Sequence, residues 1–355
     1  MMQKVLLAFI AFLFIFANQV KAQTEETMEG VVSRIVKEDS VTTADGTFVN
    51  QTLQLEMYKG SLMGEILEVN YSPSLTPGAI LYKVGDPLVV TRLRFGDEDT
   101  YYISDFVRRS ELFTLFLLFA FLVIVIGGIR GAASLVGMGF SFLVIYAMIL
   151  PMIISGKDAV GAAIAGSIVI IPVTFSLSHG LSKKTIIGVI GTAITLLIVG
   201  ILSQIFVEAT RLTGFSFEEA GILQSQLGEI NMKGILLAGI IVATLGVLDD
   251  VTISQASIVA EIIRANPKLK PKKVFVSAMR VGRDHIASLV NTLVLVYAGA
   301  SLPLMLLFVN SPRPFAEIIN YEIVADEIVR TLVGSIGLVI AVPITTILAV
   351  YYMKR

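Results

Sequence analysis

The sequence predicts an all-α transmembrane helical bundle of about seven spans, preceded by a signal peptide and a small extracytoplasmic β-barrel-like domain. Three observations predict this fold class. Of the 355 residues, 55% are hydrophobic and only 15% are charged, whereas soluble proteins have about 25% charged residues. Long apolar runs fill the chain from residue 112 onward. Shorter, alternating runs fill the part before it, which has an ordinary soluble composition.

The charge balance and the residue types exclude several classes of function. Lys and Arg number 27 against 28 Asp and Glu, so no basic field would attract a nucleic acid, and we expect no nucleic-acid partner. Cys is absent, which excludes disulfides and thiolate-bound metals. The phosphate-loop, zinc-protease and serine-hydrolase motifs are missing too. We therefore expect neither an enzyme nor a cofactor, whereas the sequence leaves a metal site undecided.

The first 22 residues resemble a secretory signal peptide. Lys4 precedes an apolar run at residues 5–17, which is too short to span about 30 Å of hydrocarbon as a helix. Val20 and Ala22 are the small residues that precede a cleavage site. We predict cleavage after Ala22, with an uncleaved signal anchor as the alternative. In both cases the residues that follow would be exported.

Residues 23–110 are expected to form the extracytoplasmic domain. Apolar and polar residues alternate at residues 30–36, 51–57, 66–69 and 88–93, and Gly, Pro and Asp residues separate these runs. Such runs are typical of short antiparallel strands. Five or six of them in so short a segment predict a small barrel.

Seven apolar runs fill residues 111–355, and most are long enough to cross a bilayer as helices. Basic residues concentrate in alternate loops, above all at residues 264–283. This asymmetry obeys the positive-inside rule and predicts a cytoplasmic C-terminus. We interpret these basic residues as determinants of topology, with contact to anionic lipid as the alternative. The predicted spans are residues 112–129, 132–154, 159–177, 185–207, 234–250, 286–309 and 328–351.

The fifth and sixth predicted spans each have a polar stripe. The fifth apolar run is too short to cross the membrane core before it meets two carboxylates, which is typical of broken helices at transporter sites. Charged groups within a membrane are costly and mark a cavity, a solute path or a partner. The alternative is that these groups lie in water at the membrane surface. The candidate substrate- or ion-binding residues are Asp249, Asp250, Ser254, Asp284, His285, Asn291 and Thr292.

Several short motifs follow one another in this region. They are LGVLDD at residues 245–250, a polar helix at 254–261, VGRD at 281–284, NTL at 291–293 and YAG at 297–299. In this order they resemble the YibE/F-like family of bacterial multipass membrane proteins, and the resemblance extends to the β-rich segment. It implies a protein of the bacterial cytoplasmic membrane, in a family usually described as permeases of unknown substrate. It also implies that one of the two carboxylates at 249–250 is the family's Asp.

Two functions are left open. The first is a permease or secondary transporter of a small solute or ion, which would bind between the fifth and sixth helices and couple to protons or Na⁺. The second is a non-transporting scaffold or sensor whose extracytoplasmic domain binds an envelope partner. The expected partners are the lipid bilayer and the unidentified solute or ion. A homo-oligomer or a complex with a second membrane protein is left open as well.

Overall fold

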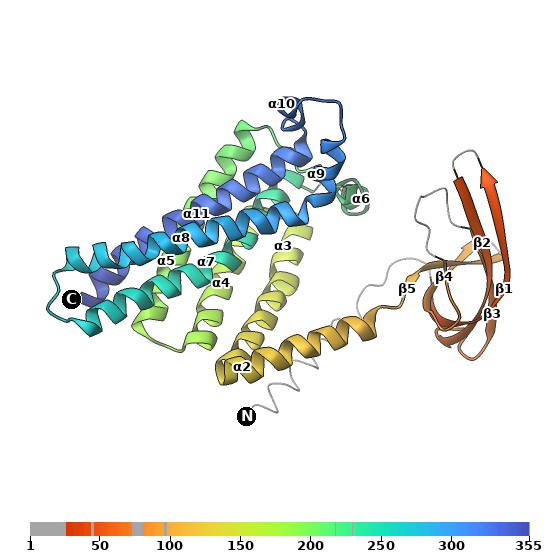
Figure 1. Cartoon of the computed structure of the whole chain (residues 1–355), viewed down its shortest axis with the longest axis horizontal. Coiled ribbons are helices and arrows are strands. Elements are labelled where there is room, and N and C mark those ends of the chain that lie inside the picture. The colour runs from red at the N-terminus through yellow and green to blue at the C-terminus, as the bar shows by residue number, and fades with distance from the viewer. Residues whose placement is uncertain are drawn as a thin grey trace. The chain divides into compact units, whose positions relative to one another are not determined.

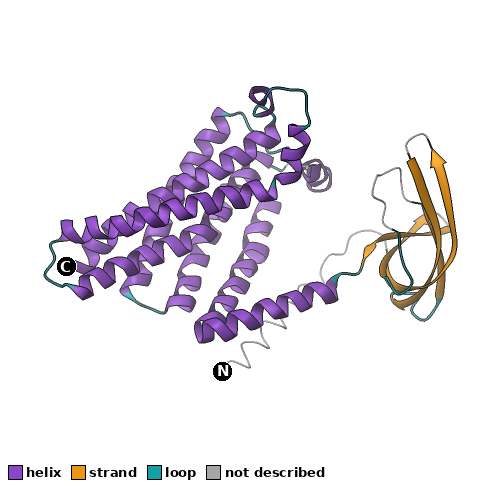
Figure 2. Cartoon of the chain, viewed as in Figure 1, coloured by secondary structure: helices purple, strands orange, loops and turns teal. Residues whose placement is uncertain are grey.

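The structure is a computed structural model that describes residues 26–43, 46–72, 81–95, 98–216, 218–228 and 230–354. The predicted signal peptide, residues 1–22, lies outside these ranges. Within them, strands occupy only the part up to residue 106, and helices occupy the part from residue 109 onward (Figure 2). The chain divides into two compact units after Leu122, and each unit has an apolar core of its own.

A five-stranded antiparallel sheet forms most of the first unit. β1 (Glu26–Thr43) lies at its centre, between β2 (Gly46–Lys59) and β4 (Pro87–Phe95). The edges are β3 (Ile66–Tyr71) and β5 (Glu98–Phe106), which gives the order β3-β2-β1-β4-β5. Four of these strands contain the alternating runs that the sequence analysis identifies, and β5 is the strand that it misses.

The sheet is not the closed barrel that the sequence predicts. Its edge strands β3 and β5 are not hydrogen-bonded to each other. β1 pairs with β2 along most of its length but with β4 only at residues 26–31, and register shifts interrupt its pairing with β2. Such bulges bend a strand, and here the sheet folds over one core without closing. The buried residues of this core are Met28, Val32, Leu53, Leu55, Met57, Val69, Tyr82, Leu88 and Val90.

Helices form the rest of the chain (Figure 1). α2 (Arg109–Val144) continues through a π-helical turn, η2 (Ile145–Ile149), into α3 (Leu150–Ile154). The other long helices are α4 (Ala159–His179), α5 (Lys183–Ala209), α7 (Met232–Ala265), α8 (Pro271–Ala300) and α11 (Glu322–Lys354). Three short helices lie between them, namely α6 (Glu218–Leu227), α9 (Leu302–Val309) and α10 (Phe315–Ile318).

Five helical stretches of the described chain are long and apolar enough to cross a membrane, or six if α8 and α9 count as one span bent by 68°. The seven predicted spans are therefore not confirmed. Residues 109–154 form one helical stretch that is interrupted at Gly128, where φ is 59° and ψ is −140°. A positive φ is readily adopted by glycine. The span predicted at residues 286–309 is not one straight helix in the structure, because the bend between α8 and α9 divides it.

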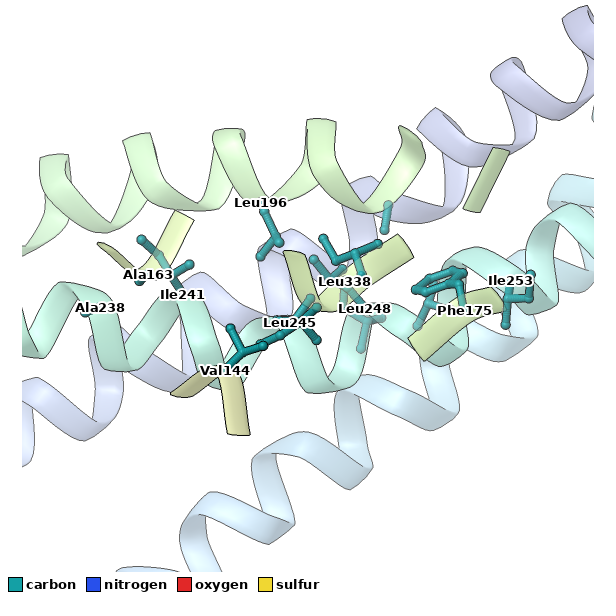
Figure 3. Packing of buried hydrophobic residues seen from close by; sticks show 14 of the residues in the cluster. Val144, Ala163, Phe175, Leu196, Ala238, Ile241, Leu245, Leu248, Ile253 and Leu338 are labelled. Atoms are coloured by element: carbon teal, nitrogen blue, oxygen red, sulfur yellow. The ribbon is translucent and has the colours of Figure 1, made fainter. Parts of the chain in front are cut away.

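α7 is the central helix of the second unit, and it contacts α4, α5, α8 and α11. The core around it contains Leu245 and Leu248 of α7, Phe175 of α4 and Leu338 of α11 (Figure 3). Gly188 of α5 allows a close approach, because a Cβ at this position would lie 2.7 Å from the Phe175 ring. Small residues serve this purpose in membrane helices generally.

Candidate functional site

The predicted site residues lie on two uninterrupted helices. α7 continues through Asp249, Asp250 and Ser254 and ends at Ala265. The sequence predicts a fifth span that is short and broken. In the structure α7 is neither. The helix continues because Leu248 and Val251, on either side of the two carboxylates, are fully buried in the apolar core.

α8 also differs from its prediction. It begins at Pro271, so that Asp284 and His285 lie near its middle and not at the start of a membrane helix. Asp284, Asn291 and Thr292 are exposed, and His285 is half-buried. The Thr292 hydroxyl donates a hydrogen bond to the carbonyl of Ser288 within the same helix, at 3.0 Å.

Two ion pairs between α5 and α7 lie toward opposite ends of α7. Lys184 pairs with Glu261 at 3.5 Å, and Lys233 pairs with Glu208 at 3.8 Å. At about 1.5 Å per residue, Asp249 lies roughly 18 Å from the first pair and roughly 24 Å from the second along α7. The sum is close to the thickness of a bilayer with its headgroups, about 40–45 Å. In a bilayer crossed by α7 between these two pairs, Asp249 would therefore lie near the middle of the apolar layer.

Asp249 and Asp250 have different environments although they are neighbours. Asp250 is exposed, whereas Asp249 is partly buried. The Oδ1 atom of Asp249 is buried and has no hydrogen-bond partner among the residues that the structure describes. A buried carboxylate oxygen without a donor is costly. Asp249, and not Asp250, is thus the carboxylate that faces the bundle.

The α7 and α8 residues of the predicted site do not form one cluster. Within the described ranges, no hydrogen bond or ion pair joins the carboxylates of α7 to the polar residues of α8. The two helices run in opposite directions from the turn at residues 266–270 (Figure 1). They are linked by Gln255, whose Nε2 donates to the carbonyl of Ala278 at 3.2 Å. Asp249 precedes Gln255 on α7 by the same number of residues by which Asp284 follows Ala278 on α8. Because the two helices are antiparallel, the two carboxylates lie at a similar distance along them from the turn.

Gln255 is the most important residue of this region that the sequence analysis misses. It is fully buried, and its Nε2 also donates to the Thr346 hydroxyl of α11 at 2.7 Å. Gly282 of α8 packs directly against it, because a Cβ at Gly282 would lie 3.1 Å from the amide atoms. Gln255 thereby joins α7, α8 and α11. The only signal in the sequence is a polar amide inside an apolar helical pattern.

Further buried oxygen atoms lie inside the bundle. The hydroxyls of Thr192 and Thr252 hydrogen-bond at 2.8 Å and link α5 to α7. Gln255 Oε1, Ser335 Oγ and Thr345 Oγ1 are buried without a hydrogen-bond partner among the residues described. Together with Asp249 Oδ1, these atoms give the interior of the second unit an unsatisfied hydrogen-bonding capacity.

A second buried carboxylate, Asp326 near the start of α11, was also missed. It is fully buried. Ser216 donates a hydrogen bond to it at 2.8 Å, and Arg330 pairs with it one turn along the helix at 3.3 Å. The signal for it in the sequence is the DEIVR spacing at residues 326–330, which is typical of a helical ion pair. Because Asp326 is satisfied by these partners, it has a structural role.

A mostly apolar groove of the second unit lies beside the bend between α8 and α9. Its volume is about 670 Å³, and α8, α9, α10 and α11 line it with mostly apolar side chains. The polar residues at its wall are Tyr297, Ser301, Ser311, Arg313, Glu327 and Thr331. It does not include any of the predicted site residues. In the described part of the chain, no group of three or more His, Asp or Glu residues could hold a metal ion.

A comparison with protein families gives one match. The model of the YibE/F-like protein family matches residues 115–355, which are the helical part of the chain. The sheet lies outside this match. No curated protein and no solved structure matches the chain. With the match covering well over half of its length, the chain belongs to the YibE/F-like family.

Proposed function

We propose that this protein is a permease or secondary transporter of a small solute or ion and that Asp249 is the group that binds the solute or its coupling ion. The observation that carries the proposal is the buried, unpartnered carboxylate oxygen of Asp249 near the middle of the apolar layer. Leaving such a group without a donor costs several kcal/mol, so ionisable residues at this depth are a default sign of function.

In this proposal the polar face of α8 contributes a separate stretch of the solute path. Asp284, Ser288 and Asn291 are exposed and lie on one face of the helix. Asp284 is at the height of Asp249, within the apolar layer. Exposing this face to lipid would be costly, and a path filled with water or solute would remove the cost. His285 and Thr292 flank the same face.

The proposed orientation has the C-terminus in the cytoplasm of a bacterial cell and residues 23–110 on the other side of its membrane. It is supported by the arrangement of basic residues at one end of the bundle. Lys354 near the C-terminus donates a hydrogen bond to the carbonyl of Pro267 at 2.7 Å. The end of α11 therefore lies beside the lysine-rich turn between α7 and α8, and the positive-inside rule places such an end in the cytoplasm.

Solute profiling of cells tests this proposal. Metals and small metabolites would be measured in cells that lack the protein and in cells restored with the wild type, Asp249→Asn or Asp250→Asn. Both substitutions remove one carboxylate, but only the first affects the buried oxygen. We expect one solute to change on loss of the protein and to be restored by the wild type and Asp250→Asn only. If Asp249→Asn restores every solute at equal expression, the proposal is wrong.

A scaffold or sensor is the second candidate, and one observation favours it. Glu29 of the sheet binds Arg109, the first residue of α2, so the sheet is tied directly to the start of this helix. A protein of this kind would lose its phenotype with Glu29→Gln and keep it with Asp249→Asn. The permease proposal predicts the opposite pattern.

A further inference from the structure

A groove lies at the end of the second unit where α8 begins and α11 ends. Its volume is about 550 Å³. The floor is apolar and is formed by Phe275 of α8 and by Ile347 and Val350 of α11. Lys272 and Lys354 stand at its wall, and no acidic residue lines it. The groove therefore combines an apolar surface with two positive charges.

The first turn of α8 adds to this positive character. α8 is a helix of 30 residues that begins at Pro271, and no side chain hydrogen bond caps its N-terminus. The N-terminus of a helix attracts anions through its free N–H groups and its dipole. Lys354 is held at the groove because its ammonium group donates to the Pro267 carbonyl. Two lysines and an uncapped helix end thus converge on one place.

We propose that this groove binds an anionic phospholipid. Its phosphate would lie between Lys272, Lys354 and the first turn of α8, and an acyl chain would cover Phe275, Ile347 and Val350. Charge complementarity selects the anionic headgroup, and the apolar floor selects a lipid over a free phosphate. The site is independent of the proposed transport site, since it lies at the membrane surface and shares no residue with it.

Native mass spectrometry of the full-length protein tests the proposal. Delipidated protein would be titrated with phosphatidylglycerol or with phosphatidylcholine, and the retained lipid would be counted. The variant pair is Lys272→Gln with Lys354→Gln, and its control is Lys268→Gln with Lys273→Gln, which removes the same charge from neighbouring lysines that do not line the groove. A third variant, Ile347→Trp, fills the groove without a change of charge.

We expect the wild type and the control to retain phosphatidylglycerol with an affinity about tenfold above phosphatidylcholine. The preference for phosphatidylglycerol, or the bound lipid itself, should be lost in the variant with Lys272→Gln and Lys354→Gln. The same loss is expected in Ile347→Trp. Excess inorganic phosphate should not displace the lipid. Equal retention of both lipids by the wild type would overturn the proposal. So would an equal loss in the control, an unchanged Ile347→Trp variant, or displacement by inorganic phosphate alone.

Discussion

Arg109 and Glu29 join the first residue of α2 to the central strand of the sheet. Arg109 Nη1 donates to Glu29 Oε1 at 2.6 Å, and Nη2 donates to Oε2. Glu29 is nearly buried in β1 and also accepts from Lys59 at 3.0 Å and from Tyr58 at 3.2 Å. A bidentate pair of this kind fixes direction as well as distance. The central strand is therefore held firmly to the first residue of α2.

The Glu29 cluster predicts a pH dependence of the sheet. Hydrogen bonds from Arg109 and, to a smaller extent, from Lys59 together lower the pKa of Glu29 from 4.5 to about 2, against the opposing effect of burial. Because the folded pKa is the lower one, the stabilisation is complete above about pH 4.5 and is lost as the pH falls toward 2. Hydrogen exchange of residues 26–36 in the full chain should be faster in Glu29→Gln than in the wild type at pH 6.

This difference should shrink as the pH falls from about 4.5 toward 2, since the Glu29 carboxyl of the unfolded wild type is protonated in this range before that of the folded protein. Comparing both proteins at each pH removes the intrinsic pH dependence of exchange. Equal exchange of the two proteins at pH 6 would show that the cluster does not stabilise β1.

The packing of Gly282 predicts a sharp difference between two glycines of α8. A Cβ at Gly282 would lie 2.6 Å from Val342 Cγ1 and would press on Gln255, whereas a Cβ at Gly299 would meet nothing within 4 Å. Gly282→Ala should therefore lower the stability by about 1–3 kcal/mol through overpacking. Gly299→Ala should be neutral or slightly stabilising, because alanine favours the helix.

The two alanine variants can be compared by heating the purified protein in detergent and measuring the fraction that stays monodisperse. Both variants replace a glycine of α8 by alanine. The effect of this change on helix propensity is common to the two and cancels when their stabilities are compared. A Gly282→Ala protein as stable as Gly299→Ala would mean that α8 does not pack on α7 and α11 as described.

The proposed solute path predicts that water reaches the polar face of α8. The chain has no native cysteine, so a single introduced thiol is the only one present. Ser288→Cys should react with a charged, water-soluble thiol reagent, because the reactive thiolate needs water. Leu197→Cys on α5 is the control, since Leu197 is an exposed apolar residue that would face lipid. We expect at least tenfold faster labelling at position 288.

Slow labelling at both positions would contradict an aqueous path along α8. If Ser288→Cys then formed a disulfide between two copies of the chain, a second copy would cover this face instead, and α8 would be an interface of a homo-oligomer.

Local patterns in the sequence predict local structure well in this protein. The alternating runs at residues 30–36 and 88–93 lie within β1 and β4 because a half-buried strand imposes a period of two. Closure of the sheet was predicted wrongly, since it depends on pairing between distant strands. The apolar run of the fifth span ends before Asp249, but α7 continues to Ala265, because buried neighbours such as Val251 keep the helix intact.

The partners of buried polar residues are the part that sequence patterns miss. Gln255 is explained only by Ala278 and Thr346, which belong to two other helices. Asp326 is likewise explained partly by Ser216, which precedes α6. Asp249 was identified because a carboxylate in an apolar run is unusual, but its difference from Asp250 depends on which side of α7 meets the core.

We propose that the buried carboxylate of Asp249 serves transport. The most direct test of this proposal is uptake, into liposomes with and without an imposed ion gradient, of the solute that cell profiling singles out. The wild type and Asp250→Asn should accumulate this solute when the gradient is present, and Asp249→Asn should lose gradient-driven accumulation by tenfold or more, as expected for loss of a group that is essential to binding. Gradient-driven uptake by Asp249→Asn at the wild-type rate would contradict the account.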